Sequence, residues 1–173
     1  MNYNLMSVKL ANIETSIILT IYVIIKKENG KMKILVDADA CPVKEIIVKL
    51  ARQRSIPVTM LIDTSHQLND GYSTVITVDK GADSVDYALM GRLSRDDIVV
   101  TQDYGLAAMV LGKGARAVNQ NGLVFTTDNI DRLLMERHFS AAVRRSGGRT
   151  KGPAKRSKAD NDKFEAVFRD MLD

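Results

Sequence analysis

From residue 33 onward, short apolar segments alternate with segments whose apolar residues recur at helical spacing. Residues 33–37 (KILVD) and 97–101 (DIVVT) belong to the first kind, and their continuous apolar character is typical of strands buried on both faces. The segment after Pro42 belongs to the second kind. This alternation predicts an α/β protein with a mostly parallel central sheet and helices on both faces. Such sheets bind ligands beyond the carboxyl ends of the strands, where the strand order reverses.

The same patterns define the individual elements. The predicted strands cover residues 33–37, 57–62, 74–78, 97–101, 115–118 and 123–126. One predicted helix begins at Pro42, where the missing N–H of proline costs nothing. Three further predicted helices cover about 84–93, 104–112 and 129–144. These elements place one α/β domain at residues 32–143.

Residues 1–31 precede the first predicted strand and contain the most apolar run of the chain, SIILTIYVII. The run is about half as long as a bilayer-spanning helix. It also lacks the basic start and the small-residue cleavage site of a signal peptide. We expect residues 1–31 to be an N-terminal extension outside the core and expect no membrane partner. A strand or helix packed on the domain and a membrane-surface anchor are the alternatives.

Cysteine and histidine are scarce in this chain. Cys41 is the only cysteine, so no disulfide can form within the chain. Together with the lack of an export signal, this favours the cytoplasm. One cysteine and two histidines also do not supply the ligands of a structural zinc site.

Positive charge is concentrated in residues 144–163. This segment carries a net charge of +6, whereas the whole chain carries +4. A basic segment on an acidic protein suits a polyanionic partner such as nucleic acid, although a solvated, flexible tail has the same composition. We expect a basic tail with a C-terminal helix over residues 144–173. The candidate nucleic-acid-binding residues are Arg144, Arg145, Arg149, Lys151, Lys155 and Arg156.

Acidic side chains gather where two predicted strands end. Asp37 and Asp39 follow the first strand, and Asp103 follows the fourth. If these strands are neighbours at the point where the strand order reverses, the three carboxylates share one crevice. Asp83 and Asp86 lie three residues apart near the start of a predicted helix. Asp86 flanks the apolar stripe of that helix, so it is the better placed of the two to reach inward.

Oxygen ligands of this kind suit a hard divalent cation, and Mg²⁺ uses a few carboxylates together with water and substrate phosphate. The sequence therefore predicts a Mg²⁺ or Mn²⁺ site. The expected metal ligands are Asp37, Asp83, Asp86 and Asp103, and the expected catalytic residues are Asp37, Asp39, Asp86 and Asp103. Each acid also has a structural explanation, because aspartates at helix starts act as caps or interact with the helix dipole.

Several blocks of the sequence resemble one family. They are MKILVDADACPVK, KGADSVDYAL, DDIVVTQDYGLAAMVLGKGA, FTTDNIDRLL, AVRRSGGRTKGP and DNDKFEAVFRDMLD. Over residues 32–173 the chain is similar to the YaiI/YqxD family of uncharacterised bacterial proteins. The resemblance implies a PIN-like nuclease fold with a metal-binding acidic cluster that acts on phosphodiesters. Asp37 and Asp103 match the strand-end acids of that fold, and Asp86 or Asp83 matches its helix acid. Tyr87 stands where a further acid is expected.

Three functions follow from these features. The leading one is a divalent-metal-dependent nuclease or phosphodiesterase whose partner is nucleic acid, with RNA favoured. A nucleic-acid-binding module without catalysis would use the basic segment alone. A phosphatase of the haloacid-dehalogenase type would use Asp37 and Asp39 as an Asp-x-Asp pair after the first strand, although Cys41 stands where Thr or Val is expected.

Overall fold

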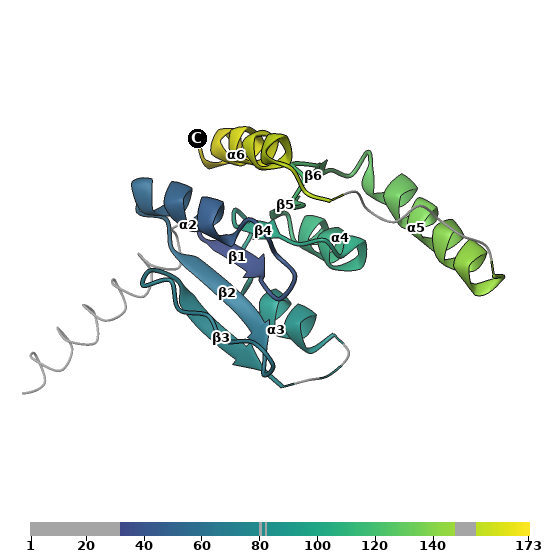
Figure 1. Cartoon of the computed structure of the whole chain (residues 1–173), viewed down its shortest axis with the longest axis horizontal. Helices are drawn as coiled ribbons and strands as arrows, with labels where there is room; N and C mark the ends of the chain where they lie inside the picture. The colour runs from purple at the N-terminus through teal and green to yellow at the C-terminus, as the bar shows by residue number, and fades with distance from the viewer. Residues whose placement is uncertain (1–31, 80, 82, 148–154) are drawn as a thin grey trace, which may run out of the picture. The chain divides into compact units, whose positions relative to one another are not determined.

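The computed structural model describes residues 32–79, 81, 83–147 and 155–173 (Figure 1). The predictions for residues 1–31 and for Arg149 and Lys151 fall outside these residues. Within the described part, six strands form one sheet in the order β3-β2-β1-β4-β5-β6. They are β1 (Ile34–Asp37), β2 (Val58–Asp63), β3 (Thr74–Val78), β4 (Ile98–Val100), β5 (Arg116–Val118) and β6 (Val124–Phe125). Every pairing is parallel except that of β5 with β6.

Helices cover both faces of this sheet, as the sequence predicts. They are α2 (Lys44–Gln53), α3 (Ser84–Arg92), α4 (Tyr104–Gly112), α5 (Ile130–Arg145) and α6 (Lys158–Leu172). Helices α2 and α6 contribute to one apolar cluster, and α3, α4 and α5 contribute to the other. The fold is therefore α/β with a mostly parallel sheet, which is consistent with a PIN-like fold.

Strand β1 lies at the centre of the sheet and supplies both clusters. Ile34 and Val36 belong to the cluster with α2 and α6, and Leu35 belongs to the opposite one. All three side chains are fully buried, because successive side chains of a strand point to opposite faces. This burial explains why the strand is continuously apolar until Asp37.

Helix α6 packs on the domain, although the sequence analysis places it in a basic tail. Phe164 and Phe168 are fully buried, and their rings stack with centroids 5.2 Å apart. The helix begins with a capping box in which Ser157 and Asp160 exchange side-chain-to-backbone hydrogen bonds. This segment is rich in charged residues, yet α6 also carries an apolar stripe that helps to form the core.

Helix α2 begins two residues later than predicted. Pro42 and Val43 form a turn, and the helix starts at Lys44. The carbonyl oxygen of Ala38 accepts a hydrogen bond from the Cys41 N–H at 3.3 Å and another from Lys44 Nζ at 2.7 Å. This turn fixes the chain between Asp37 and α2, at the edge of the sheet where the candidate site lies.

Candidate functional site

The strand order reverses between β1 and β4, which pair directly with each other. The prediction that these two strands are neighbours is therefore confirmed. Thr101, which follows β4, donates a hydrogen bond from Oγ1 to Asp37 Oδ2 at 2.9 Å. The same hydroxyl oxygen accepts a hydrogen bond from the Asp103 N–H at 3.0 Å. Thr101 thus links the two strand-end acids, a role that the sequence analysis did not identify.

Four carboxylates near this reversal, those of Asp37, Asp83, Asp86 and Asp103, interact electrostatically. We call this group, with the hollow that the last three of them line, the acidic crevice. Burial, followed by repulsion from Asp103, Asp37 and Asp83, raises the pKa of Asp86 to about 6. Burial also raises the pKa of Asp37, with further contributions from Asp39 and Asp103 and an opposing one from the Thr101 hydroxyl. Carboxylates that raise one another's pKa share a region of strongly negative potential. Such a region favours a bound cation.

Helix α3 places Asp83 and Asp86 on the rim of a hollow of about 480 Å³. Its other lining residues are Tyr87, Met90, Asp103, Gly105, Leu106 and Met109. Asp83 occupies the N-cap position of α3 with a left-handed φ of 63°, but its side chain makes no capping hydrogen bond. Asp83 therefore stands at the expected N-cap position without a side-chain cap, and its carboxylate contributes to the field on Asp86.

Asp103 is both a helix cap and a member of the crevice. Its Oδ1 accepts hydrogen bonds from the N–H groups of Gly105 at 2.6 Å and Leu106 at 3.1 Å. Its Oδ2 pairs with Arg137 Nη1 at 3.1 Å. The Asp103 side chain thus caps α4 and is also one of the expected metal ligands. Arg137 supplies the local counter-charge.

Asp39 is directed to β2 and not to the start of α2. Both of its oxygens accept the Asp63 N–H at 3.1 Å, and Oδ1 lies 3.0 Å from His66 Nδ1. Among the described residues, Asp39, Asp63 and His66 form the only group of three possible metal ligands whose ligand atoms all lie within 4.8 Å of one another. Hydrogen bonds from Ser65 and His66 lower the pKa of Asp63 to about 2.

No three of the predicted ligands Asp37, Asp83, Asp86 and Asp103 reach that spacing within the described part of the chain. Their oxygen-only chemistry nevertheless fits Mg²⁺, which retains several waters between itself and the protein. Cys41 is buried, and burial raises the pKa of its thiol. A protonated thiol is a poor nucleophile, so Cys41 does not compete with the carboxylates for a chemical role.

The candidate nucleic-acid-binding residues lie in different environments. Arg144 and Arg145 form the last turn of α5. Lys155 and Arg156 precede α6, and Lys155 is exposed. Arg156 instead joins α6 to the loop before β6, because it donates to Asn161 Oδ1 at 2.7 Å, Asn121 Oδ1 at 3.0 Å and the Gln120 carbonyl at 2.8 Å. Arg156 therefore has a structural role.

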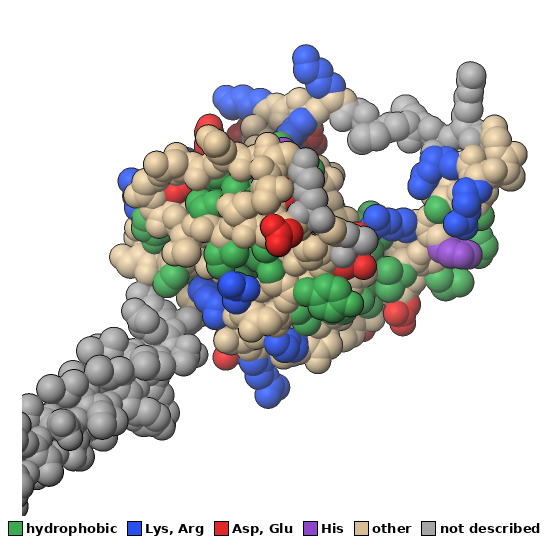
Figure 2. All heavy atoms as spheres, turned by 90° about the horizontal axis from the view of Figure 1, so that it is seen from below, with side chains coloured by type: hydrophobic (Ala, Val, Ile, Leu, Met, Phe, Trp, Pro, Cys, Tyr) green, Lys and Arg blue, Asp and Glu red, His purple; other side chains and the backbone are tan. Residues whose placement is uncertain are grey.

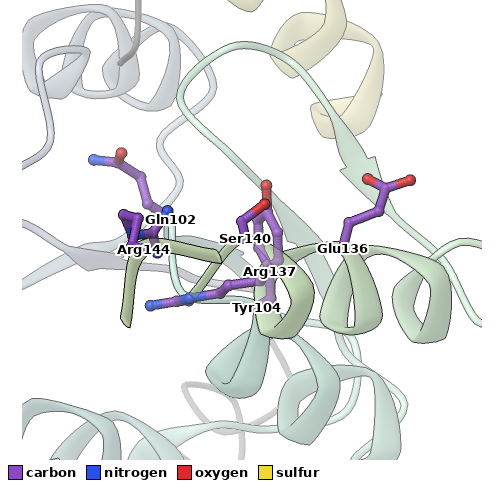
Figure 3. A pocket seen from close by; sticks show the side chains of 6 residues that line it. All are labelled: Gln102, Tyr104, Glu136, Arg137, Ser140 and Arg144. Atoms are coloured by element: carbon purple, nitrogen blue, oxygen red, sulfur yellow. The ribbon is translucent and has the colours of Figure 1, made fainter. Parts of the chain in front are cut away.

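Figure 3 shows a second hollow, of about 370 Å³. One of its lining residues, Arg137, pairs with Asp103. Its lining residues are Gln102, Tyr104, Glu136, Arg137, Ser140 and Arg144. We call it the arginine hollow. Arg137 could not be identified from the sequence, because an isolated arginine on a helix surface belongs to no recognisable pattern.

The molecule also exposes several large apolar side chains, and Figure 2 shows apolar, acidic and basic groups mixed on one face. Those most exposed are Tyr87, Met109, Met135, Phe139 and Val143. Among the described helices, none has the length and apolar character needed to cross a membrane.

The fold and the crevice define an α/β protein with an acidic cluster at the reversal of strand order. The chain belongs to the YaiI/YqxD family: the family described as "Uncharacterized BCR, YaiI/YqxD family" matches residues 35–173. This confirms the family resemblance.

Similar relatives bear the name UPF0178 protein. One from Ruminiclostridium cellulolyticum is 65% identical over 137 residues, which cover 79% of this chain and 90% of the relative. One from Clostridium acetobutylicum is 52% identical over 82% of this chain and 97% of the relative. One from Exiguobacterium sibiricum is 48% identical over 82% and 96%, respectively. No solved structure matches the chain.

Proposed function

We propose that this protein is a cytoplasmic, Mg²⁺- or Mn²⁺-dependent nuclease or related phosphodiesterase. The observation that supports this proposal best is the pairing of β1 with β4, which brings Asp37 and Asp103 together through Thr101 and beside Asp86. A folded protein that keeps repelling charges together at the carboxyl ends of its strands holds a site suited to a cation. Nucleic acid, with RNA favoured, is the expected substrate.

In this proposal Asp37, Asp86 and Asp103 hold the metal, and Asp83 adds negative charge at the rim. A bound divalent ion lowers the pKa of a water nucleophile and stabilises charge on phosphate oxygens. Thr101 orients Asp37 through its 2.9 Å hydrogen bond. The two backbone N–H groups at the start of α4 fix Asp103.

The position of Asp39 weighs against the phosphatase alternative. In that mechanism the second acid of an Asp-x-Asp pair transfers a proton at the reacting group. Here both Asp39 oxygens accept the Asp63 N–H, and one also contacts His66. A binding module without catalysis keeps the basic residues but gives no reason for the negative field around Asp86.

A cleavage assay tests the proposal. Labelled single-stranded RNA and DNA are incubated with the wild type, Asp37→Asn and Asp86→Asn, in Mg²⁺, Mn²⁺ or EDTA. We expect metal-dependent cleavage by the wild type and a loss of about a hundredfold or more in each variant, since even outer-shell partners of metals contribute 10–100-fold. Asp170→Asn, an exposed acid on α6, is the matched control and should cleave normally. Cleavage by Asp37→Asn at the wild-type rate, or no cleavage by the wild type with either metal, would refute the proposal.

A further inference from the structure

The arginine hollow lies at the start of α4, where this helix contacts α5. Its volume of about 370 Å³ is at the lower end of the range for small-molecule sites, about 300–1,000 Å³. Figure 3 shows the side chains that line it, which come from α5, from the start of α4 and from Gln102 just before α4. All of them carry polar groups, whereas the hollow that Asp86 lines also contains Met90, Leu106 and Met109.

Arg137 is held on the wall of this hollow from two directions. Its Nη1 pairs with Asp103 Oδ2 at 3.1 Å, and its guanidinium carbon lies 5.7 Å from the centroid of the Tyr104 ring. Tyr104 is itself packed edge-on against Phe125, with centroids 5.6 Å apart and an interplanar angle of 64°. Since Phe125 is buried, the tyrosine ring is a firm support for the arginine.

The Arg137 guanidinium can bind a second partner while it remains paired with Asp103. Its pair with Asp103 uses Nη1, and a guanidinium has five N–H donors in a planar fork. The side chain is 51% exposed, so the group is open to solvent. Planar donors of this kind match the oxygens of a phosphate group.

The remaining lining residues are polar or charged. They include a second arginine, Arg144. Glu136 is the acid of the set, and it pairs with Arg132 on the same helix at 2.6 Å, which offsets its charge. Gln102 is anchored by a 3.0 Å hydrogen bond from Nε2 to the Ala40 carbonyl. The hollow thus presents the exposed Arg137 guanidinium to an anion that arrives beside the acidic crevice.

We propose that the arginine hollow binds a backbone phosphate of a single-stranded nucleic acid, adjacent to the phosphate that the acidic crevice would cleave. Asp103 connects the two sites, because it belongs to the acidic crevice and also pairs with Arg137. A single strand fits better than a duplex, because its unpaired bases remain accessible to side chains. The plane of an arginine can also stack on an unpaired base. The direction of the strand toward the crevice rests on the proposed function, but binding in the hollow does not.

Fluorescence anisotropy tests the hollow without any need for cleavage. A labelled single-stranded oligonucleotide is titrated in EDTA with the full-length wild type, Arg137→Gln, Arg137→Lys and Arg169→Gln. Arg169 is the control, because it is an exposed arginine on α6 that pairs with Glu165 of the same helix. We expect Arg137→Gln to bind about tenfold more weakly, within the range for a lost charge-assisted hydrogen bond. Its slope of log K against log salt should also be shallower by about 0.7, the value for one phosphate contact on a single strand.

The other two variants separate specific from general effects. Arg137→Lys keeps the charge, so it should keep the salt slope and recover part of the affinity. Arg169→Gln should bind like the wild type. Unchanged binding by Arg137→Gln, or an equal loss in Arg169→Gln, would overturn the proposal. Because Arg137 and Asp103 are both partly exposed, loss of their ion pair should change the melting temperature little. The lysine variant tests the charge even if the glutamine variant does not fold.

Competition with inorganic phosphate distinguishes the possible sources of the phosphate group. The oligonucleotide should bind the wild type more tightly than free phosphate does. If free phosphate binds more tightly and this binding depends on Arg137, the hollow is a small-molecule site and the nucleic-acid proposal is wrong. The outcome is independent of the metal proposal, since EDTA is present throughout. A wild type that cleaves normally beside an Arg137→Gln variant that binds normally would refute the hollow alone.

Discussion

Replacing Asp86 with asparagine should stabilise the metal-free protein at neutral and alkaline pH. Burial and three acidic neighbours raise the pKa of Asp86 from 3.8 to about 6. For a group shielded from water, this difference corresponds to a cost of about 3 kcal/mol for holding the charged form. Asp86 is only partly buried, so solvent screening reduces the expected gain to about 1 kcal/mol.

The gain should depend on pH in a defined direction. Below about pH 4, Asp86 is protonated in both the folded and the unfolded chain, and the substitution changes little. Between about pH 4 and pH 6, the folded protein keeps a proton that the unfolded chain releases, so wild-type stability falls as pH rises. Above about pH 6 the folded wild type bears the full cost of a charged Asp86, and Asp86→Asn does not.

Thermal melts in EDTA at pH 3.5 and pH 8 measure this effect. We expect Asp86→Asn to melt about 3 °C above the wild type at pH 8 and with it at pH 3.5. Asp170→Asn, exposed on α6, is the control and should show no gain at either pH. A gain of equal size at both pH values, or a loss at pH 8, would show that repulsion at Asp86 is not the cause. Asp86 is a sharper probe than Asp103, whose loss also removes a cap and an ion pair.

Three further substitutions test other parts of the structure. Thr101→Val should lower the free energy of unfolding by about 1 kcal/mol in urea titrations, because it removes the hydrogen bond to Asp37; unchanged stability would mean that the link does not hold the two strand ends. Arg156→Gln should cost about 1 kcal/mol, because it removes hydrogen bonds to partly buried acceptors, yet oligonucleotide binding by anisotropy should not change. The reverse pattern would return Arg156 to the nucleic-acid-binding set. Phe168→Ala should lower the free energy of unfolding by about 3–5 kcal/mol in the same urea titrations, whereas Arg169→Ala, at an exposed position, should lower it little. A small effect of Phe168→Ala would show that α6 does not complete the core.

The sequence is sufficient to predict the central part of this fold. Strands such as β1 and β4 are buried on both faces, so their residues are apolar without interruption. The pairing of these two strands then brings Asp37 and Asp103 to the same edge, as the topology rule for parallel sheets requires.

The contacts that complete the site depend on side-chain directions, and sequence spacing does not determine these. Asp39 turns to β2 because its oxygens find the Asp63 N–H. Arg137 approaches Asp103 from a helix 34 positions further along the chain. In the sequence Thr101 looks like any other strand residue. Only the fold brings its hydroxyl to Asp37. The apolar stripe of α6 is hidden from a charge count by its basic neighbours.

The dependence of one face of the sheet on α6 has a consequence for synthesis on the ribosome. By the time residue 125 has been made, all six described strands exist. Phe164 and Phe168, which pack with α2 on that face, have not yet been added. The nascent chain therefore passes through an interval in which a nearly complete sheet presents uncovered apolar side chains to the cell. Such a surface is what chaperones bind and what drives aggregation of partly folded chains, so a slow ribosome over residues 126–163 would prolong that exposure.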